Sequence, residues 1–151
     1  MDIRDRKLAQ LIVQYSLEVQ PGQRVLIRGG VLGEPLIKEF YREVLAAGAH
    51  PFLMNQFNWE EEELLTRGNA EQVAHIHKPV EVLYGEYDRL IRVLAEDNTK
   101  NLNGIDPQKY AEFTQSRAPL MKTYMDRTAR GELHWALTLY PTNAYAQDAD
   151  M

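Results

Sequence analysis

The stretch from Gln23 to Gln56 constrains the fold of this chain more than any other. Residues 24–28 form a short run rich in β-branched residues between the Pro21-Gly22 turn and Gly29-Gly30, a pattern typical of a strand. Over residues 36–45, pairs of apolar residues then recur with helical period. Residues 51–57 predict a second strand. Two strands joined by one short helix form a βαβ unit, whose strands are parallel and whose crossover is right-handed.

The rest of the chain continues this alternation of helix and strand. An amphipathic helix is expected over 3–19, and its predicted core face consists of Leu8, Leu11, Ile12, Tyr15 and Val19. Alternating apolar positions predict further strands at 89–95 and 133–139, the first of them with one partly polar side. Short helices are expected between the second and third strands. The last of these, 80–86, has helical spacing but could also pair as a strand.

A long helical stretch is expected from residue 107 to residue 129. Asp106 and Pro107 are typical of a helix cap followed by a first-turn proline. Pro119 lies inside this stretch and cannot donate to the helical hydrogen bonds, so the helix should bend or divide near Arg117. Together these elements predict an α/β fold with an open, mostly parallel sheet and helices on both faces. The fold is Rossmann-like without the dinucleotide motif, and residues 1–151 are expected to form one domain.

Composition narrows the classes of partner. The net charge of −5 argues against general binding to nucleic acid or to an anionic membrane, because both need a cationic surface. The 151 residues include no cysteine, which removes disulfides, thiolate nucleophiles and cysteine-based zinc sites. The charged N-terminus has no signal-peptide core, and no apolar run is long enough to span a bilayer. We expect a cytoplasmic protein.

The carboxyl ends of the predicted strands are where a ligand is expected in such a sheet. Those ends are Arg28-Gly29-Gly30, Asn55-Gln56, residues 96–99 and residues 141–143. The candidate cavity-lining residues are Arg28, Glu96, Asn98 and Thr142. A nucleotide is disfavoured, because neither glycine-rich phosphate motif is present and Glu34 places negative charge near the first loop. The alternative for Gly29-Gly30 is a tight strand-to-helix turn.

His75 and His77 are a candidate metal pair. In a strand the two side chains would share a face, but in the helix expected here they point away from each other. A zinc site needs three or four converging ligands, and no third ligand is evident. Surface histidines are therefore favoured over a metal site. Residue chemistry alone shows no assembled active site in this chain.

Four stretches of the chain resemble the N-terminal region of the thermophilic metalloaminopeptidases, peptidase family M29, also called the aminopeptidase T family. They run from Tyr15 to Arg28, from Leu45 to Pro51, from Ala95 to Leu102 and from Gly131 to Met151. The last, with Tyr-Pro-Thr-x-Ala-x-Ala-Gln, is the most specific.

The resemblance implies a two-domain, typically dimeric exopeptidase that removes N-terminal amino acids from peptides with two divalent metals of the zinc or cobalt type. The family's metal ligands lie in a C-terminal domain that matches nothing here, so no catalytic or metal-binding residue is carried over to this chain. The chain is then expected to be the non-catalytic N-terminal domain, inactive alone, which shapes and covers the active-site cavity. Its expected partners are that catalytic domain, peptide substrates and a second copy.

One alternative from another class stays open. The chain could be a self-contained small-ligand-binding module that uses the loops at the carboxyl ends of its strands. The sequence downstream of Met151 would separate the two interpretations. The sequence does not indicate the preferred N-terminal residue or the metal in use.

Overall fold

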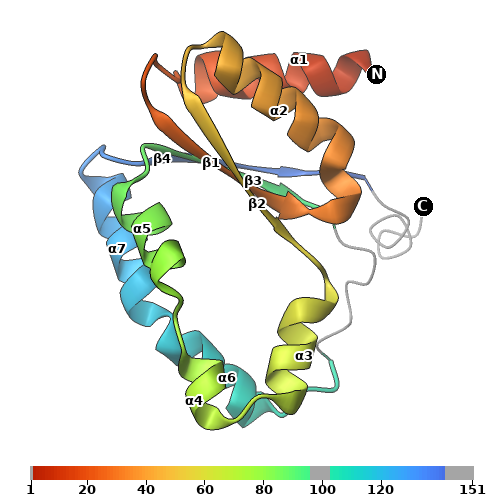
Figure 1. Ribbon diagram of the computed structural model, residues 1–151, viewed down its shortest axis with the longest axis vertical. Helices are drawn as coiled ribbons and strands as arrows, with labels where there is room; N and C mark the ends of the chain where they lie inside the picture. Colours follow the sequence, from red (N-terminus) through yellow and green to blue (C-terminus); the bar gives the residue numbers. More distant parts are fainter. Residues whose placement is uncertain (1, 96–102, 142–151) are drawn as a thin grey trace.

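The computed structural model describes residues 2–95 and 103–141, and within them the chain forms one sheet of four parallel strands. The strands are β1 (Arg24–Gly30), β2 (His50–Gln56), β3 (Arg89–Leu94) and β4 (His134–Leu139). Their order in the sheet is β2-β1-β3-β4. The predicted βαβ unit is confirmed, because β1 and β2 pair in parallel with Arg24 opposite His50. The predicted fold class, an open α/β sheet with helices on both faces, is also confirmed (Figure 1).

The helices cover the two faces of the sheet unequally. They are α1 (Ile3–Leu11), the π-helical turn η1 (Ile12–Ser16), the 3-10 turn η2 (Val31–Gly33), α2 (Glu34–Ala46), α3 (Trp59–Arg67), α4 (Ala70–Ala74), α5 (Lys78–Glu86), α6 (Pro107–Ser116) and α7 (Ala118–Ala129). Figure 1 shows α1 and α2 on one face and α5 and α7 on the other, with α3, α4 and α6 extending away from the sheet. Residues 80–86 are helical, and the stretch 107–129 divides at Arg117, as Pro119 predicts.

Alternation along β1 divides the core into two clusters. Val25 and Ile27 face α1 and α2, where the larger cluster also contains Phe40, which is fully buried. Leu26 faces the other way, toward Tyr84 of α5 and residues of α7. Because side chains of a strand alternate between faces, the next residue on the Leu26 face is Arg28. A charged side chain thus comes directly after the smaller cluster.

The first helix differs from its prediction. The expected regular helix over 3–19 would bury Leu11 and Tyr15, but these side chains are 53% and 72% exposed. The π-helical turn η1 inserts a wider loop of backbone, with Leu17 N donating to Ile12 O at 2.9 Å. This extra residue rotates the sequence about the helix axis, so Val13 and Leu17 enter the core instead.

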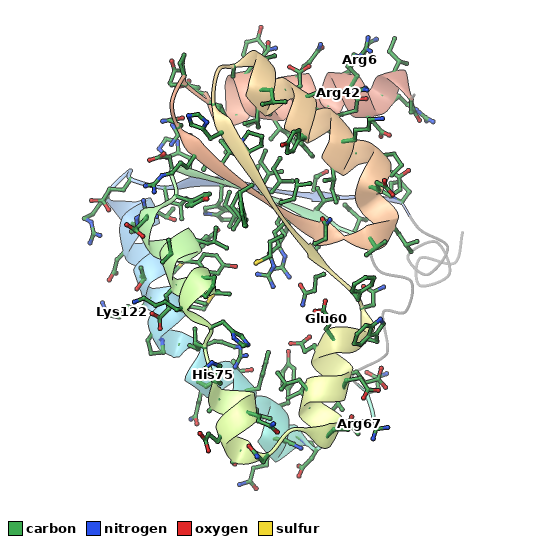
Figure 2. The ribbon with its side chains drawn as sticks, in the orientation of Figure 1. Arg6, Arg42, Glu60, Arg67, His75 and Lys122 are labelled. Atoms are coloured by element: carbon green, nitrogen blue, oxygen red, sulfur yellow. The ribbon has the colours of Figure 1, made fainter. Side chains whose placement is uncertain are left out.

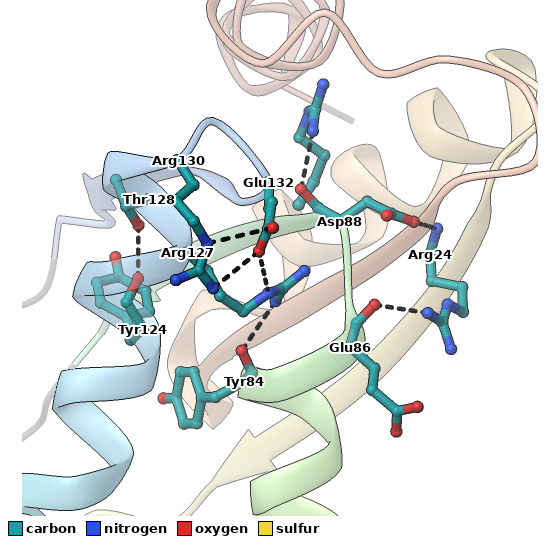
Figure 3. Close-up of polar contacts among 10 residues, drawn as sticks. Arg24, Tyr84, Glu86, Asp88, Tyr124, Arg127, Thr128, Arg130 and Glu132 are labelled. Carbon is teal, nitrogen blue, oxygen red and sulfur yellow. Dashed lines mark hydrogen bonds and ion pairs between the residues drawn. The ribbon is translucent and has the colours of Figure 1, made fainter.

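The amino-terminal end of the sheet is held by polar contacts (Figure 3). The backbone N–H of Arg24 donates to Asp88 Oδ2 at 2.8 Å, and the Arg24 side chain donates to the Glu86 carbonyl. Arg127 Nη1 donates to the Tyr84 carbonyl at 2.8 Å. These contacts join the start of β1 to the loop before β3, and α7 to α5, at the end of the sheet opposite the expected ligand site.

The surface charges lie mainly on the helices. Figure 2 shows Arg6 and Arg42 on the side of α1 and α2, and Glu60, Arg67, His75 and Lys122 on the side where α3 to α7 lie. Arg67 and Lys122 form ion pairs with acidic residues one turn away. Within residues 2–95 and 103–141, no helix has both the length and the apolar character needed to cross a bilayer.

Candidate functional site

The strand order places a topological switch point between β1 and β3. From β1 the chain crosses to β2 on one side, and from β2 it crosses back to β3 on the other side of β1. In open α/β sheets, ligands bind at the carboxyl ends of the strands at such a point. A pocket of about 130 Å³ lies there. Its lining comes from the ends of β1, β2 and β3 and the start of α3: Arg28, Gly29, Gly30, Gln56, Phe57, Asn58, Glu61, Arg92, Val93, Leu94 and Ala95.

Arg28 is a partly buried residue in the lining of this pocket. Its Nη1 donates to Tyr84 Oη at 2.6 Å, and its Nη2 donates to Gln56 Oε1 at 3.1 Å. Its Nε is buried and has no hydrogen-bond partner in the described part of the chain. A guanidinium carries five N–H donors and is always charged. Among the residues that the structure describes, Arg28 therefore meets neutral acceptors only, and some of its donors have no acceptor.

Arg92 stands beside Arg28 on the neighbouring strand. The two residues are register partners in the parallel pair β1–β3, so their side chains leave the same face of the sheet. Arg92 is exposed and forms no hydrogen bond or ion pair with the residues that the structure describes. It lies near the edge-to-face pair of Tyr84 and Tyr124. Burial raises the pKa of Tyr124 to about 12, Tyr84 adds to the rise, and Arg92 opposes it.

The two glycines at the end of β1 are required by packing. A Cβ on Gly30 would collide with the carbonyl oxygen of Ala95, and a Cβ on Gly29 would lie 2.8 Å from Cδ1 of Ile37. The strand predicted at 24–28 is two residues longer, because Gly29 and Gly30 also pair in it. Their small size brings β1 close to the end of β3 and to α2. This accounts for the glycines without a bound phosphate.

Of the predicted cavity-lining residues, Arg28 lines the pocket. Glu96, Asn98 and Thr142 lie outside the described residues. Sequence reasoning missed Arg92, although it noted the partly polar side of this strand. The signal that could have found it is the single charge inside the apolar run Leu90-Ile91-Arg92-Val93-Leu94. Without the register, nothing in the sequence places that charge opposite Arg28.

The candidate metal pair is arranged differently from its prediction. His75 and His77 do not lie in a helix but in the extended link between α4 and α5, with their rings edge to face and 4.7 Å between centroids. The expectation that they point away from each other is therefore wrong. In the described part of the chain, no group of three or more His, Asp or Glu could hold a metal ion. A pair of histidines alone does not complete a metal site.

Comparison with known proteins identifies the family. The family model described as thermophilic metalloprotease (M29) matches residues 2–150. The chain belongs to the M29 metallopeptidase family. Aminopeptidase 2 of Geobacillus stearothermophilus is 26% identical to this M29 chain in an alignment 156 positions long that covers 93% of the chain. The solved structure of wild-type AmpT from Thermus thermophilus superposes on 96% of it with a TM-score of 0.78 at 16% identity, and shows the same fold.

This M29 chain is much shorter than those relatives. It spans 35% of the length of Aminopeptidase 2 and 38% of the AmpT chain. The family is a metallopeptidase family, yet the described residues do not fit a metal centre. The pocket between β1 and β3 instead offers two guanidinium groups. Its chemistry suits the binding of an anionic group and not the activation of water by a metal.

Proposed function

We propose that this chain is the non-catalytic N-terminal domain of a metal-dependent aminopeptidase that removes N-terminal amino acids from peptides. One observation carries the proposal: the M29 family model matches residues 2–150, while the chain spans only 35% of a related aminopeptidase. In this proposal, the metal ligands belong to a further domain, and the present domain shapes and covers the cavity of the active site. No catalytic step is assigned to its residues.

Exposed apolar side chains on the face of the sheet that α5 and α7 partly cover support contact with another part of a longer protein. Trp135, Leu137 and Leu139 succeed one another on the same face of β4 and are 47%, 51% and 51% exposed. Phe52 of β2 is 50% exposed at the opposite edge of that face. Contiguous exposed apolar side chains mark surfaces that bind a partner. Since Arg28 and Arg92 lie on the same face, a domain covering it would also close the pocket.

Measurements of metal binding and of hydrolysis by the 151-residue chain test whether the catalytic metal ligands belong to a further domain. We expect calorimetry with zinc or cobalt to show no stoichiometric binding, because a two-metal site needs several converging ligands. We also expect no release of amino acids from aminoacyl chromogenic substrates in metal-supplemented buffer. A longer protein encoded by the same reading frame is expected to release them and to stop when a chelator is added. Chelator-sensitive turnover by the 151-residue chain would overturn the proposal.

A self-contained ligand-binding module is the second candidate, and the pocket at the switch point favours it. The reading frame downstream of residue 151 separates the two proposals. Glutamate and histidine ligands encoded there support the peptidase domain, whereas a stop codon supports the module. The use of zinc or cobalt by the family's metal centre, a homodimer and a cytoplasmic location stay predictions.

A further inference from the structure

Two guanidinium groups on neighbouring strands need a counter-charge. Arg28 and Arg92 are direct register partners, and like charges placed side by side in a sheet are destabilising. Neither side chain forms an ion pair with any carboxylate in the described part of the chain. The other charged side chain in the pocket lining is Glu61 of α3. Among the described residues, the lining thus carries two positive charges against one negative charge.

The free donors of the pair point to an oxyanion. One N–H of each terminal nitrogen of Arg28 is taken by Tyr84 and Gln56, which hold the guanidinium in place. The remaining donors of Arg28 and all those of Arg92 have no acceptor among the described residues. Planar guanidinium groups match the two oxygens of a carboxylate or the oxygens of a phosphate.

The charge of the described lining residues favours one of these two anions. The described lining residues have a net charge of one positive unit, which balances a singly charged carboxylate better than a phosphate, which carries close to two negative charges at neutral pH. The volume of about 130 Å³ has room for a carboxylate and a few neighbouring atoms.

We propose that Arg28 and Arg92 form a binding site for a carboxylate group of a peptide. The peptide as the source of that carboxylate rests on the proposed function. In an aminopeptidase the amino end of the substrate lies at the reaction centre, so a group bound here belongs to the far end of a short peptide. Arg28 is fixed in the site by its hydrogen bonds to Tyr84 and Gln56. Arg92 is exposed and has no partner in the described chain, so its guanidinium group is available to bind the ligand.

Binding of trialanine to the metal-free 151-residue chain tests the site. With NMR, the free-acid peptide is expected to shift the side-chain Nε–H signals of Arg28 and Arg92, and trialanine amide is expected to leave them unchanged. Arg92→Met should weaken binding of the free acid at least about tenfold, the effect of losing a charge-assisted hydrogen bond. Arg92→Lys should retain part of the affinity, because it keeps the charge but loses the planar fork.

The matched control is Lys38→Met, which removes one exposed positive charge from α2 on the other face of the sheet. It should bind the free acid as the parent chain does. Equal binding of acid and amide, an equal loss in the Lys38→Met chain, or binding of inorganic phosphate without the peptide acid would each overturn the proposal. The measurement needs neither metal nor turnover, so it tests the carboxylate site separately from the proposed function. If the 151-residue chain is inactive but binds trialanine, the carboxylate site is supported. If a longer protein is an active peptidase but the 151-residue chain does not bind trialanine, the carboxylate site is wrong and the proposed function stands.

Discussion

Strands β1 and β3 each carry two arginines, one toward each end of the sheet. The arginines at the two ends have different hydrogen-bond partners. At the amino-terminal end, Arg24 donates to the Glu86 carbonyl, while Arg89 Nε donates to the Leu17 carbonyl at 2.7 Å. At the carboxyl-terminal end, Arg28 meets neutral side chains, and Arg92 meets no acceptor in residues 2–95 and 103–141.

The contrast separates charges that serve the fold from charges that are available to a ligand. A buried guanidinium is tolerated only where acceptors surround it, and Arg89, 8% exposed, has carbonyl acceptors supplied by the chain itself. Arg92 is solvated and keeps its hydrogen-bonding capacity. The same residue type is therefore held by the fold at one end of the strand, and at the other it has no acceptor among the described residues.

Removing Arg89 should have the largest effect on stability. Arg89→Met leaves the Leu17 carbonyl without its 2.7 Å donor and loosens the link between the end of η1 and the start of β3. A hydrogen bond to a charged group contributes about 1.5–3 kcal/mol, so we expect a loss of that size in the free energy of unfolding. Urea unfolding followed by circular dichroism measures it. A loss below about 0.5 kcal/mol, the level of an ordinary surface change, would mean that this arginine is not structural.

The glycine at the other end of β1 should come next. Gly30→Ala places a methyl group against the Ala95 carbonyl oxygen, so β1 and β3 would have to separate under the pocket. Overpacking of this kind costs about 1–3 kcal/mol. Gly85→Ala in α5 is the control, since nothing lies within 4 Å of the added methyl. It should raise stability by up to about 1 kcal/mol, because alanine favours a helix. Equal effects of both changes would argue against the close approach.

Local signals in the sequence predicted most of the fold. The parallel pairing of β1 and β2 followed from the βαβ pattern, and the division at Arg117 followed from the chemistry of Pro119. The helix expected through His75 and His77 was wrong. Pro79 lies in the first turn of a new helix, so the residues before it leave the helical conformation. The π-helical turn in the first helix had no local signal and depends on how the helix packs.

Of the two arginines in the candidate site, Arg28 could be predicted from local signals and Arg92 could not. Arg28 comes after an apolar run at a predicted strand end, and that position alone marked it. Arg92 lies inside its strand, and its importance comes from the register with Arg28, 64 positions earlier in the chain. Strand order and register arise from contacts between distant segments, which one sequence does not reveal. The tyrosine that orients Arg28, Tyr84, comes from α5 and was equally out of reach.

The pH dependence of stability should reveal the raised pKa of Tyr124. Burial raises the pKa of Tyr124 to about 12, whereas an unfolded tyrosine titrates near ~10. Between these values the unfolded state binds fewer protons, so the stability due to this proton is full below pH ~10 and is lost as pH rises through about 12. Tyr124→Phe should therefore lose less stability than the parent chain between about pH 9 and about pH 11.

Urea unfolding at the two pH values measures this difference. Tyr15→Phe is the matched control, because the Tyr15 side chain is 72% exposed, and it should behave like the parent chain at both values. If the Tyr124→Phe chain loses as much stability as the parent, the pKa of Tyr124 is not raised by folding. The buried cluster beside Arg92 would then be more open to water than its packing indicates.

Arg92→Met should have the smallest effect on the free energy of unfolding. It tests the carboxyl-terminal end of the sheet, as Arg89→Met tests the amino-terminal end. The side chain is exposed and donates to no described residue, so the free energy of unfolding should change by no more than about 0.5 kcal/mol. Relief of repulsion with Arg28 should offset the packing lost from the arginine stem. Added salt should stabilise the parent chain more than the variant, because salt screens that repulsion. Urea unfolding at low and high salt measures both quantities. A loss as large as that expected for Arg89→Met would show that the chain itself supplies acceptors to Arg92, and the two ends of the sheet would then be alike.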